Sequence, residues 1–164
     1  MKKILFFLVI SFLVLSSCTQ HTDEVFKKKV VFKDQNWKRF DNQVFEFQVT
    51  PKDTLDLSMV FTYDIKKFNY KHFPINITLY TPGDEIRSRD YRYNFYDFKS
   101  KNWKGEIHGD TALINLNIRK GLSFSKAGKL KIVLENKNSR VDNPGIISLE
   151  LKAVRFEKNT KHSK

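Results

Sequence analysis

Apolar side chains recur at every second position through much of this chain. Between residues 55 and 63, Leu55, Leu57, Met59, Phe61 and Tyr63 alternate with mainly polar residues. This is the spacing of one face of a β-strand, whereas one face of an α-helix repeats about every 3.6 residues. No stretch carries an apolar stripe at helical spacing that is long enough for a major helix. The alternation predicts half-buried strands at residues 45–49, 55–63, 75–79, 91–95, 114–118, 130–134 and 147–153.

Turn-forming residues separate these segments. They occur as Pro51-Lys52-Asp53, Thr81-Pro82-Gly83-Asp84, His108-Gly109-Asp110, Ala127-Gly128-Lys129 and Asp142-Asn143-Pro144-Gly145. Short strands joined by such turns, without helices between them, are typical of antiparallel sandwiches and barrels. About eight strands fit, which predicts an all-β antiparallel sandwich of the jelly-roll type, with an immunoglobulin-like sandwich as the alternative. Since 15 of the 164 residues are phenylalanine, we expect a core rich in aromatic rings.

The first residues have the order of an export signal. Lys2 and Lys3 precede an apolar run from Ile4 to Leu15, which ends in Leu15-Ser16-Ser17-Cys18. The run is shorter than the ~20 apolar residues that span a bilayer, and polar residues follow it at once. Leu15-Ser16-Ser17-Cys18 resembles a lipobox, in which the cysteine thiol accepts a diacylglycerol. We therefore expect residues 1–17 to be a lipoprotein signal peptide and Cys18 to be the lipidation site.

The remaining chain is long enough for one domain of ordinary size. Residues 18–29 are polar, without apolar periodicity, and are predicted to form a lipidated tether. A β-sandwich is expected over 30–157, followed by a basic tail at 158–164. The chain carries 30 Lys and Arg against 18 Asp and Glu. Export argues against nucleic acid as the anion, which leaves acidic glycans, lipid headgroups, an acidic protein partner or simply a solvated basic surface.

Residues that could bind a metal or take part in catalysis are scattered along the sequence and form no known motif. His108 stands between Glu106 and Asp110, but no second His or Cys completes the spacing of a zinc site, so no metal site is expected. The chain has no Gly-x-Ser-x-Gly nucleophile motif. Asp56 and Asp64 flank one strand and are the candidates for a glycosidase carboxylate pair, although a water-facing position explains both. No catalytic residue and no cofactor are predicted.

Aromatic and cationic residues alternate between Arg87 and Trp103, which is the most unusual segment in composition. Such a surface can stack on sugar rings and attract anions. Core packing on one face with cations on the other is the competing explanation. The candidate binding residues are Tyr91, Arg92, Tyr93, Tyr96 and Trp103.

Two short motifs are similar to the acceptor sequence of O-glycosylation systems in gliding Gram-negative bacteria. They are Asp53-Thr54-Leu55 and Asp110-Thr111-Ala112. Both lie at the edges of predicted turns, where a glycan could be accommodated. Thr54 and Thr111 are therefore candidate acceptors.

A set of short motifs in a fixed order resembles the gliding-motility lipoprotein GldH family. It comprises the lipobox cysteine, Asn36-Trp37, Phe45-Glu46-Phe47, Asn76-Ile77-Thr78-Leu79, Trp103-Lys104-Gly105, Gly109-Asp110, Phe124, Ala127-Gly128-Lys129 and Asn143-Pro144-Gly145-Ile146. The resemblance implies a non-enzymatic outer-membrane lipoprotein, anchored through Cys18, that assembles with other motility and secretion lipoproteins. In some lipoproteins an aspartate directly after the lipidated cysteine retains the protein at the inner membrane. Thr19 occupies this position here, which is consistent with sorting to the outer membrane. Either face of that membrane is compatible with the sequence. The alternatives are a jelly-roll lipoprotein that binds an acidic glycan through Trp103 and the tyrosine-rich strand, and an envelope hydrolase.

Overall fold

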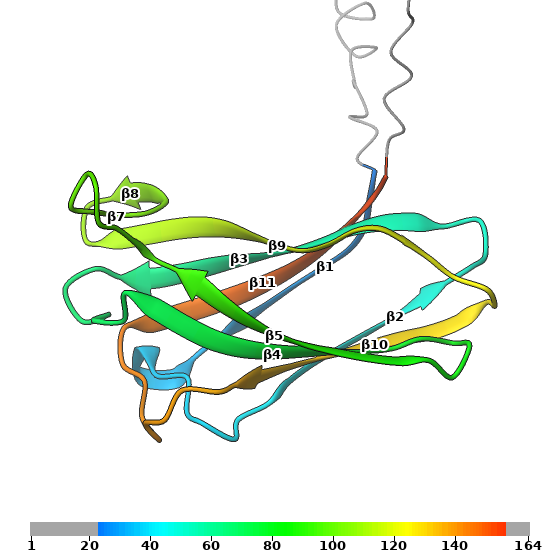
Figure 1. Ribbon diagram of the computed structural model, residues 1–164, viewed down its shortest axis with the longest axis horizontal. Helices are drawn as coiled ribbons and strands as arrows, with labels where there is room; N and C mark the ends of the chain where they lie inside the picture. The colour runs from blue at the N-terminus through cyan, green and yellow to red at the C-terminus, as the bar shows by residue number, and fades with distance from the viewer. Residues whose placement is uncertain (1–22, 157–164) are drawn as a thin grey trace, which may run out of the picture.

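The alternating segments form two antiparallel β-sheets that pack face to face (Figure 1). The computed structural model describes residues 23–156. The first sheet contains, in spatial order, β1 (Glu24–Val31), β11 (Ile146–Arg155), β3 (Thr54–Asp64), β9 (Thr111–Ser123) and β8 (Glu106–His108). The second sheet contains β2 (Gln43–Val49), β10 (Gly128–Asn136), β4 (His72–Tyr80) and β5 (Ile86–Asn94). A short 3₁₀ turn, η1 (Lys33–Gln35), and a two-stranded ribbon of β6 (Tyr96–Asp97) and β7 (Asn102–Trp103) lie in the connections.

The strand order is that of a jelly roll. With β6, β7 and β8 set aside, the first sheet has the order β1-β11-β3-β9 and the second has the order β2-β10-β4-β5. The chain therefore crosses between the sheets at most of its connections, as it does in two interlocked Greek keys. The prediction of a jelly-roll sandwich is confirmed. The immunoglobulin-like alternative is wrong, because its first two strands are neighbours in one sheet, whereas β1 and β2 lie in different sheets.

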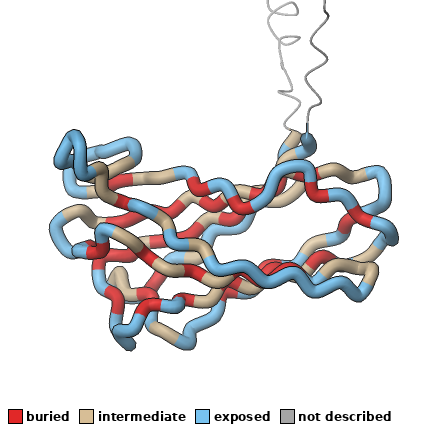
Figure 2. Tube along the Cα trace, in the orientation of Figure 1, coloured by how far each residue is buried: buried red, intermediate tan, exposed pale blue. Residues whose placement is uncertain are grey.

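The core lies between the sheets, where the inward faces of the strands meet (Figure 2). Along β3 the predicted inward residues, from Leu55 to Tyr63, are all buried. Aromatic rings fill one end of this core, and their centroids lie 4.7 to 6.1 Å apart around Phe61 and Phe68. Tilted and edge-to-face pairs of this kind stabilise a core beyond the area that they bury.

The tether predicted for residues 18–29 is too long, because β1 begins at Glu24 and pairs with β11 along its length. β1 is an edge strand, and edge strands accept charged residues that discourage pairing with other molecules. Lys27, Lys28 and Lys29 are exposed, and only Val25, Phe26 and Val30 are packed against the core. Because three lysines are consecutive here, apolar and polar residues do not alternate along β1, and the sequence pattern does not identify it as a strand.

The two ends of the described chain lie side by side (Figure 1). The backbone N–H of Arg155 donates to the carbonyl oxygen of Asp23 at 2.8 Å. We call this end of the sandwich, which also contains Thr54, the tether end, and the opposite end the distal end. The signal peptide, Cys18 and the basic tail lie outside the described residues. Within residues 23–156 no helix is long and apolar enough to cross a membrane.

Candidate functional site

Hydrogen bonds between buried amides hold the connections of the distal end together. The side chain of Asn143 is fully buried, and its Nδ2 donates to the carbonyl oxygen of Trp37 at 3.1 Å. Asn136 Nδ2 donates to the same oxygen at 2.8 Å. The Oδ1 of Asn36 accepts from the backbone N–H of Asn143 at 2.7 Å. The segment before β2 is thereby joined to the segment before β11, although more than a hundred residues separate them in the sequence.

Two glycines allow the backbone to approach closely at this end. Gly145 has φ +86°, and a Cβ atom there would lie 2.4 Å from the backbone nitrogen of Phe68. Gly105 has φ +106°, and its Cβ would lie 2.3 Å from the carbonyl oxygen of Leu113. Neither position has room for a side chain, and the left-handed backbone favours glycine as well.

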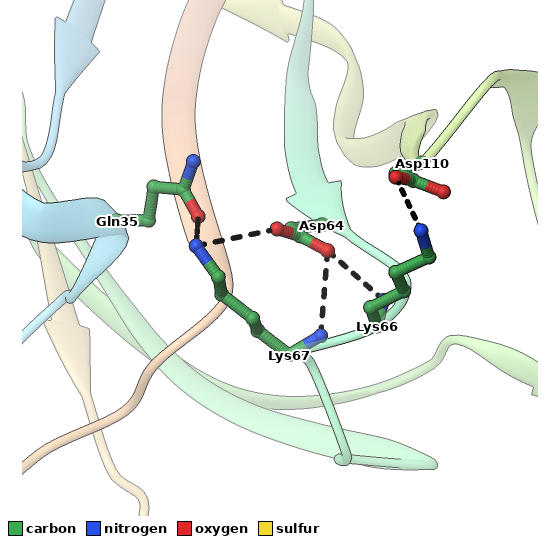
Figure 3. A network of polar contacts seen from close by, with 5 residues as sticks. All are labelled: Gln35, Asp64, Lys66, Lys67 and Asp110. Carbon is green, nitrogen blue, oxygen red and sulfur yellow. Dashed lines mark hydrogen bonds and ion pairs between the residues drawn. The ribbon is translucent and has the colours of Figure 1, made fainter.

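A polar network joins three connections on the surface of the distal end (Figure 3). Lys67 Nζ donates to Gln35 Oε1 at 2.9 Å and lies 3.6 Å from Asp64 Oδ2. Lys66 Nζ donates to Asp110 Oδ2 at 2.7 Å, and this bond raises the pKa of the Lys66 ammonium. The backbone N–H groups of both lysines donate to Asp64 Oδ1. Both lysine side chains are exposed, so the network positions loops and adds little stability.

The predicted binding residues are not gathered on one surface. Tyr91 and Tyr93 point between the sheets, stacked at 5.4 Å with an interplanar angle of 7°. Their hydroxyl groups donate to backbone carbonyl oxygens of β9, those of Ile118 at 2.7 Å and Asn117 at 3.3 Å. Burial raises the pKa of Tyr93, and the neighbouring Tyr91 raises it further. These two tyrosines close the sandwich between β5 and β9.

Tyr96 and Trp103 lie apart from that pair, in the β6–β7 ribbon at the distal end. Trp103 is half-buried against Tyr63 and Phe68, at 6.0 and 5.9 Å between ring centroids. Tyr96 packs edge-on against Trp103 and lies beneath the ammonium group of Lys71, which is 5.1 Å from its ring centroid. The two residues thus link the ribbon to the core.

An exposed aromatic patch surrounds this ribbon. Phe98 is 56 % exposed and stacks on His72 at 5.9 Å. Lys71 Nζ lies 5.1 Å from the centroid of the Phe98 ring as well as from that of Tyr96. Arg92 is exposed on the outer face of β5 and contributes to neither the patch nor the tyrosine pair. We call Lys71, His72, Tyr96 and Phe98 the ribbon patch.

An open cleft lies on the edge of the sandwich where β5 faces β9. Its volume is about 310 Å³. The lining consists of three arginines, three aliphatic side chains and one tyrosine, namely Arg87, Arg89, Arg119, Ile77, Leu79, Ile118 and Tyr91. No carboxylate lines it. The arginines of this cleft can bind an anionic group, and its aliphatic side chains can contact an apolar group beside it.

The acidic and histidine candidates have structural explanations. Asp56 Oδ1 accepts from the backbone N–H of Gly121 at 2.8 Å, at a bulge in β9, while Asp64 belongs to the network of Figure 3. Eight residues of strand separate the two carboxylates, about 27 Å at ~3.4 Å per residue, whereas glycosidase pairs lie ~5–9.5 Å apart. His108 is exposed in β8. Among residues 23–156, no group of three or more His, Cys, Asp or Glu could hold a metal ion.

The two candidate glycosylation sites lie at opposite ends of β3. Thr54 is the first residue of β3, at the tether end. Thr111 is the first residue of β9 and pairs with Asp64 at the distal end. Both side chains are partly exposed. Their modification stays a prediction.

Comparison with models of known protein families shows to which family the chain belongs. The sequence model of the GldH lipoprotein family matches residues 24–152, which is nearly the whole sandwich. The chain belongs to the GldH lipoprotein family. It is therefore a lipoprotein associated with gliding motility, from a family of envelope proteins that is not a known enzyme family. No curated protein sequence matches it.

Two solved structures align with this GldH-family chain at low similarity. The dimeric latent PorU of Porphyromonas gingivalis aligns at 10 % identity and a TM-score of 0.34 over 79 % of the chain. The aligned part is 13 % of the PorU chain. TmCBM61, solved in complex with β-1,4-galactotriose, aligns at 12 % identity and a TM-score of 0.31, over 79 % of this chain and 82 % of its own.

The GldH-family motifs coincide with the contacts that hold the distal end together. Asn36-Trp37 and Asn143-Pro144-Gly145 bond to each other. Trp103-Lys104-Gly105 fits against Tyr63, whose hydroxyl donates to the carbonyl oxygen of Lys104 at 2.5 Å. These three family motifs thus take part in contacts that hold the fold together.

Tyr63 gives the fold a predictable response to high pH. Its side chain is buried, and burial raises its pKa from 10.0 to about 12. Because the unfolded phenol ionises first, this contribution to stability is complete below about pH 10 and is lost as the pH rises towards 12. In Tyr63→Phe the Lys104 carbonyl oxygen loses its partner, at a cost of about 1–3 kcal/mol at pH 8.

We expect the stability difference between the native protein and Tyr63→Phe to shrink between pH 10 and pH 12. Urea unfolding of both proteins at several pH values measures it. Lysines and other tyrosines titrate in both proteins, so their effects cancel in the difference. A difference that stays constant over this range would contradict the raised pKa.

Proposed function

We propose that this protein is a non-enzymatic outer-membrane lipoprotein that serves as a component of the gliding-motility and associated secretion machinery. The family match over residues 24–152 carries the proposal. Acyl chains on Cys18 would confine the sandwich to the membrane, because each buried methylene contributes ~0.8 kcal/mol. Asp23 follows Cys18 by five residues, so the tether end lies within about 18 Å of the anchored cysteine. The ordered domain thus begins close to the bilayer.

The distal end has the features of a surface that contacts a partner. Phe40, at 77 % exposed, lies beside Val141, at 58 % exposed, because the backbone N–H of the preceding Arg39 donates to the Val141 carbonyl oxygen. Phe40 has φ +75°, an uncommon backbone conformation for an aromatic residue. The Arg39 guanidinium lies 5.2 Å from its ring centroid. Exposed aromatics beside arginine are enriched in protein–protein interfaces.

Pull-down of the acylated protein from cross-linked envelopes tests the proposal. We expect other envelope lipoproteins of the motility or secretion apparatus to co-purify, and their yield to fall several-fold in Phe40→Ser. Phe156→Ser is the matched control, since Phe156 is an exposed aromatic residue at the tether end, where its backbone N–H donates to the carbonyl oxygen of Thr54. Loss of solvent-exposed Phe40 should leave the melting temperature unchanged. Co-purification of no envelope protein, with Cys18 acylated, would refute the assembly role.

Binding of an acidic glycan is the second candidate, and the ribbon patch is the observation that favours it. Phe98 offers an exposed ring beside the Lys71 ammonium, a combination that can stack on a sugar and attract its carboxylate. Trp103 is a poor test residue because its ring packs on Tyr63 and Phe68. Binding of an acidic polysaccharide that is abolished in Phe98→Ala, with an unchanged melting temperature, would favour this function over the assembly role.

A further inference from the structure

Two arginines of β5 occupy positions where a sandwich strand normally carries core residues. In the register of β4 and β5, Arg89 lies opposite Ile77 and Arg87 lies opposite Leu79. Directly opposed residues of antiparallel strands share a face of the sheet, and Ile77 and Leu79 are buried. Arg87 and Arg89 therefore point to the inner side of the sheet, into the cleft between β5 and β9.

The charge of this cleft is only partly balanced. Arg87 pairs with Glu85 at 2.5 Å, at the mouth of the β4–β5 turn. Arg89 lies over the ring of Tyr91 at 5.5 Å, and Arg119 reaches the cleft from β9. Among the described residues, neither Arg89 nor Arg119 forms an ion pair with a carboxylate. Two guanidinium groups that can bind an anion in a bidentate manner are thus available beside an apolar floor.

The cleft opens at the unpaired edges of both sheets. Within residues 23–156, β5 pairs only with β4, and β9 beyond Leu113 pairs only with β3. An unpaired strand presents a row of free N–H and C=O groups, which is the template for adding a strand. The Tyr91 and Tyr93 hydroxyls donate to carbonyl oxygens of Ile118 and Asn117 in β9, so these side chains close the gap between the sheets at their end of β5. The half of β5 that carries Arg87 and Arg89 faces the open cleft.

A sugar ring cannot use the one aromatic residue of the cleft as a stacking platform. Arg89, Tyr91 and Tyr93 follow one another on the same face of β5. Tyr91 therefore has the Arg89 guanidinium on one side, at 5.5 Å, and the Tyr93 ring on the other, at 5.4 Å. Both faces of its ring are covered, and the cleft has no other aromatic lining. Peptide carboxylates satisfy the arginines without a stacking surface.

We propose that the edge of β5 binds an extended acidic segment of a partner protein, which adds as a strand and directs alternate carboxylates toward Arg87, Arg89 and Arg119. Side chains on the inner face of an added strand alternate as Arg87 and Arg89 do, with Cβ atoms about 4.5–5.5 Å from their cross-strand neighbours. An apolar strand would bury the inward arginines without a partner for their charge, so its binding is disfavoured. A strand with acidic residues supplies that partner, so its binding is favoured. The proposal deepens the assembly role and rests on it for the existence of a natural partner.

Peptide binding to the acylated mature protein in detergent micelles tests the site. The probe is a capped, fluorescent peptide in which glutamate alternates with threonine, and anisotropy measures its affinity. One control peptide has glutamine in place of glutamate, and another carries N-methyl groups on alternate amides, which prevents strand pairing. We expect Arg89→Gln to weaken binding of the glutamate peptide about tenfold, which is about 1.4 kcal/mol. Arg119→Gln should act similarly, since its guanidinium faces the same cleft.

Arg92→Gln is the matched control, because Arg92 is an exposed arginine of the same strand on its outer face. It should change the affinity by less than about twofold. Equal binding of the glutamine or N-methylated peptide, or equal loss in Arg92→Gln and Arg89→Gln, would overturn the proposal. Binding of oligogalacturonate but not of the glutamate peptide, with loss in Arg89→Gln, would also overturn it and assign the cleft to acidic saccharides.

The envelope pull-down separates this inference from the assembly role. If envelope lipoproteins co-purify equally with the native protein and with Arg89→Gln, the assembly role stands and the acidic-strand site is refuted as its interface. If the glutamate peptide binds in the Arg89-dependent manner while no envelope protein co-purifies, the site stands and the assembly role fails. Melting curves of each variant exclude misfolding as the cause.

Discussion

We expect Gly145→Ala to lower the free energy of unfolding by roughly 2–5 kcal/mol, a large part of the stability of a domain of this size. The left-handed backbone costs an alanine ~1–2 kcal/mol, and forcing an atom into a packed site costs about 1–3 kcal/mol more. The new Cβ would lie 2.4 Å from the nitrogen and 2.7 Å from the Cα of Phe68, both of them backbone atoms that cannot rotate away. Phe68 is at the centre of the aromatic end of the core, so its displacement would disturb several ring contacts. Urea unfolding monitored by tryptophan fluorescence measures the effect.

Gly109→Ala is the matched control for the steric part of this effect. Gly109 also has a left-handed backbone, at φ +60°, but a Cβ atom there would meet nothing within 4 Å. This variant should therefore lose only the conformational cost of ~1–2 kcal/mol. Similar losses in both variants would show that the close approach to Phe68 is not what requires glycine at Gly145.

Most of the fold can be predicted from the alternation of apolar residues, because a strand with one buried face must repeat every second residue. β3 shows this best, since its predicted inward residues are all buried. The failures lie on edge strands. β1 carries three lysines in a row, and the first half of β5 carries arginines at its inward positions, so neither alternates between apolar and polar residues. An edge strand is only partly covered, and its sequence is accordingly less restricted.

The candidate site could be predicted only in part. The unusual composition between Arg87 and Trp103 indicated the correct region, but the strand register decides which side chains share a face. Tyr91 and Tyr93 serve to join the sheets, while Tyr96 and Trp103 belong to a ribbon at the distal end. The sequence gives no sign of Arg119, because thirty residues separate it from Arg89 and only the packing of the two sheets brings it to the cleft. No local pattern carries that information.

Several residues of the family motifs are constrained by the fold, whereas the arginines of the cleft are not. Asn36, Asn143 and Gly145 are fixed by buried or partly buried hydrogen bonds and by a close backbone contact at the distal end. Buried polar groups tolerate little change, since an unpaired one costs ~1–3 kcal/mol. The arginines of the cleft are exposed, and the fold places no such demand on them.

The second large effect that we expect is loss of acylation and of signal-peptide cleavage in Cys18→Ala. A thioether-linked diacylglycerol requires the cysteine thiol, and the chain has one cysteine. Without acyl chains the variant loses an anchoring free energy of ~0.8 kcal/mol per buried methylene. The variant should retain residues 1–17, migrate as a larger polypeptide and lose acyl labelling. Metabolic labelling with palmitate, gel mobility and envelope fractionation measure these changes.

Ser17→Ala is the matched control, because it replaces one small residue of the lipobox by another and should leave acylation and processing unchanged. The sandwich itself should melt at the same temperature in Cys18→Ala, since β1 begins only at Glu24 and its pairing with β11 does not involve the cysteine. Acylation and folding are then separate properties of the chain. An unchanged mobility and undiminished palmitate label in Cys18→Ala would show that the anchor lies elsewhere, and the assembly role would lose the confinement to the envelope on which it depends.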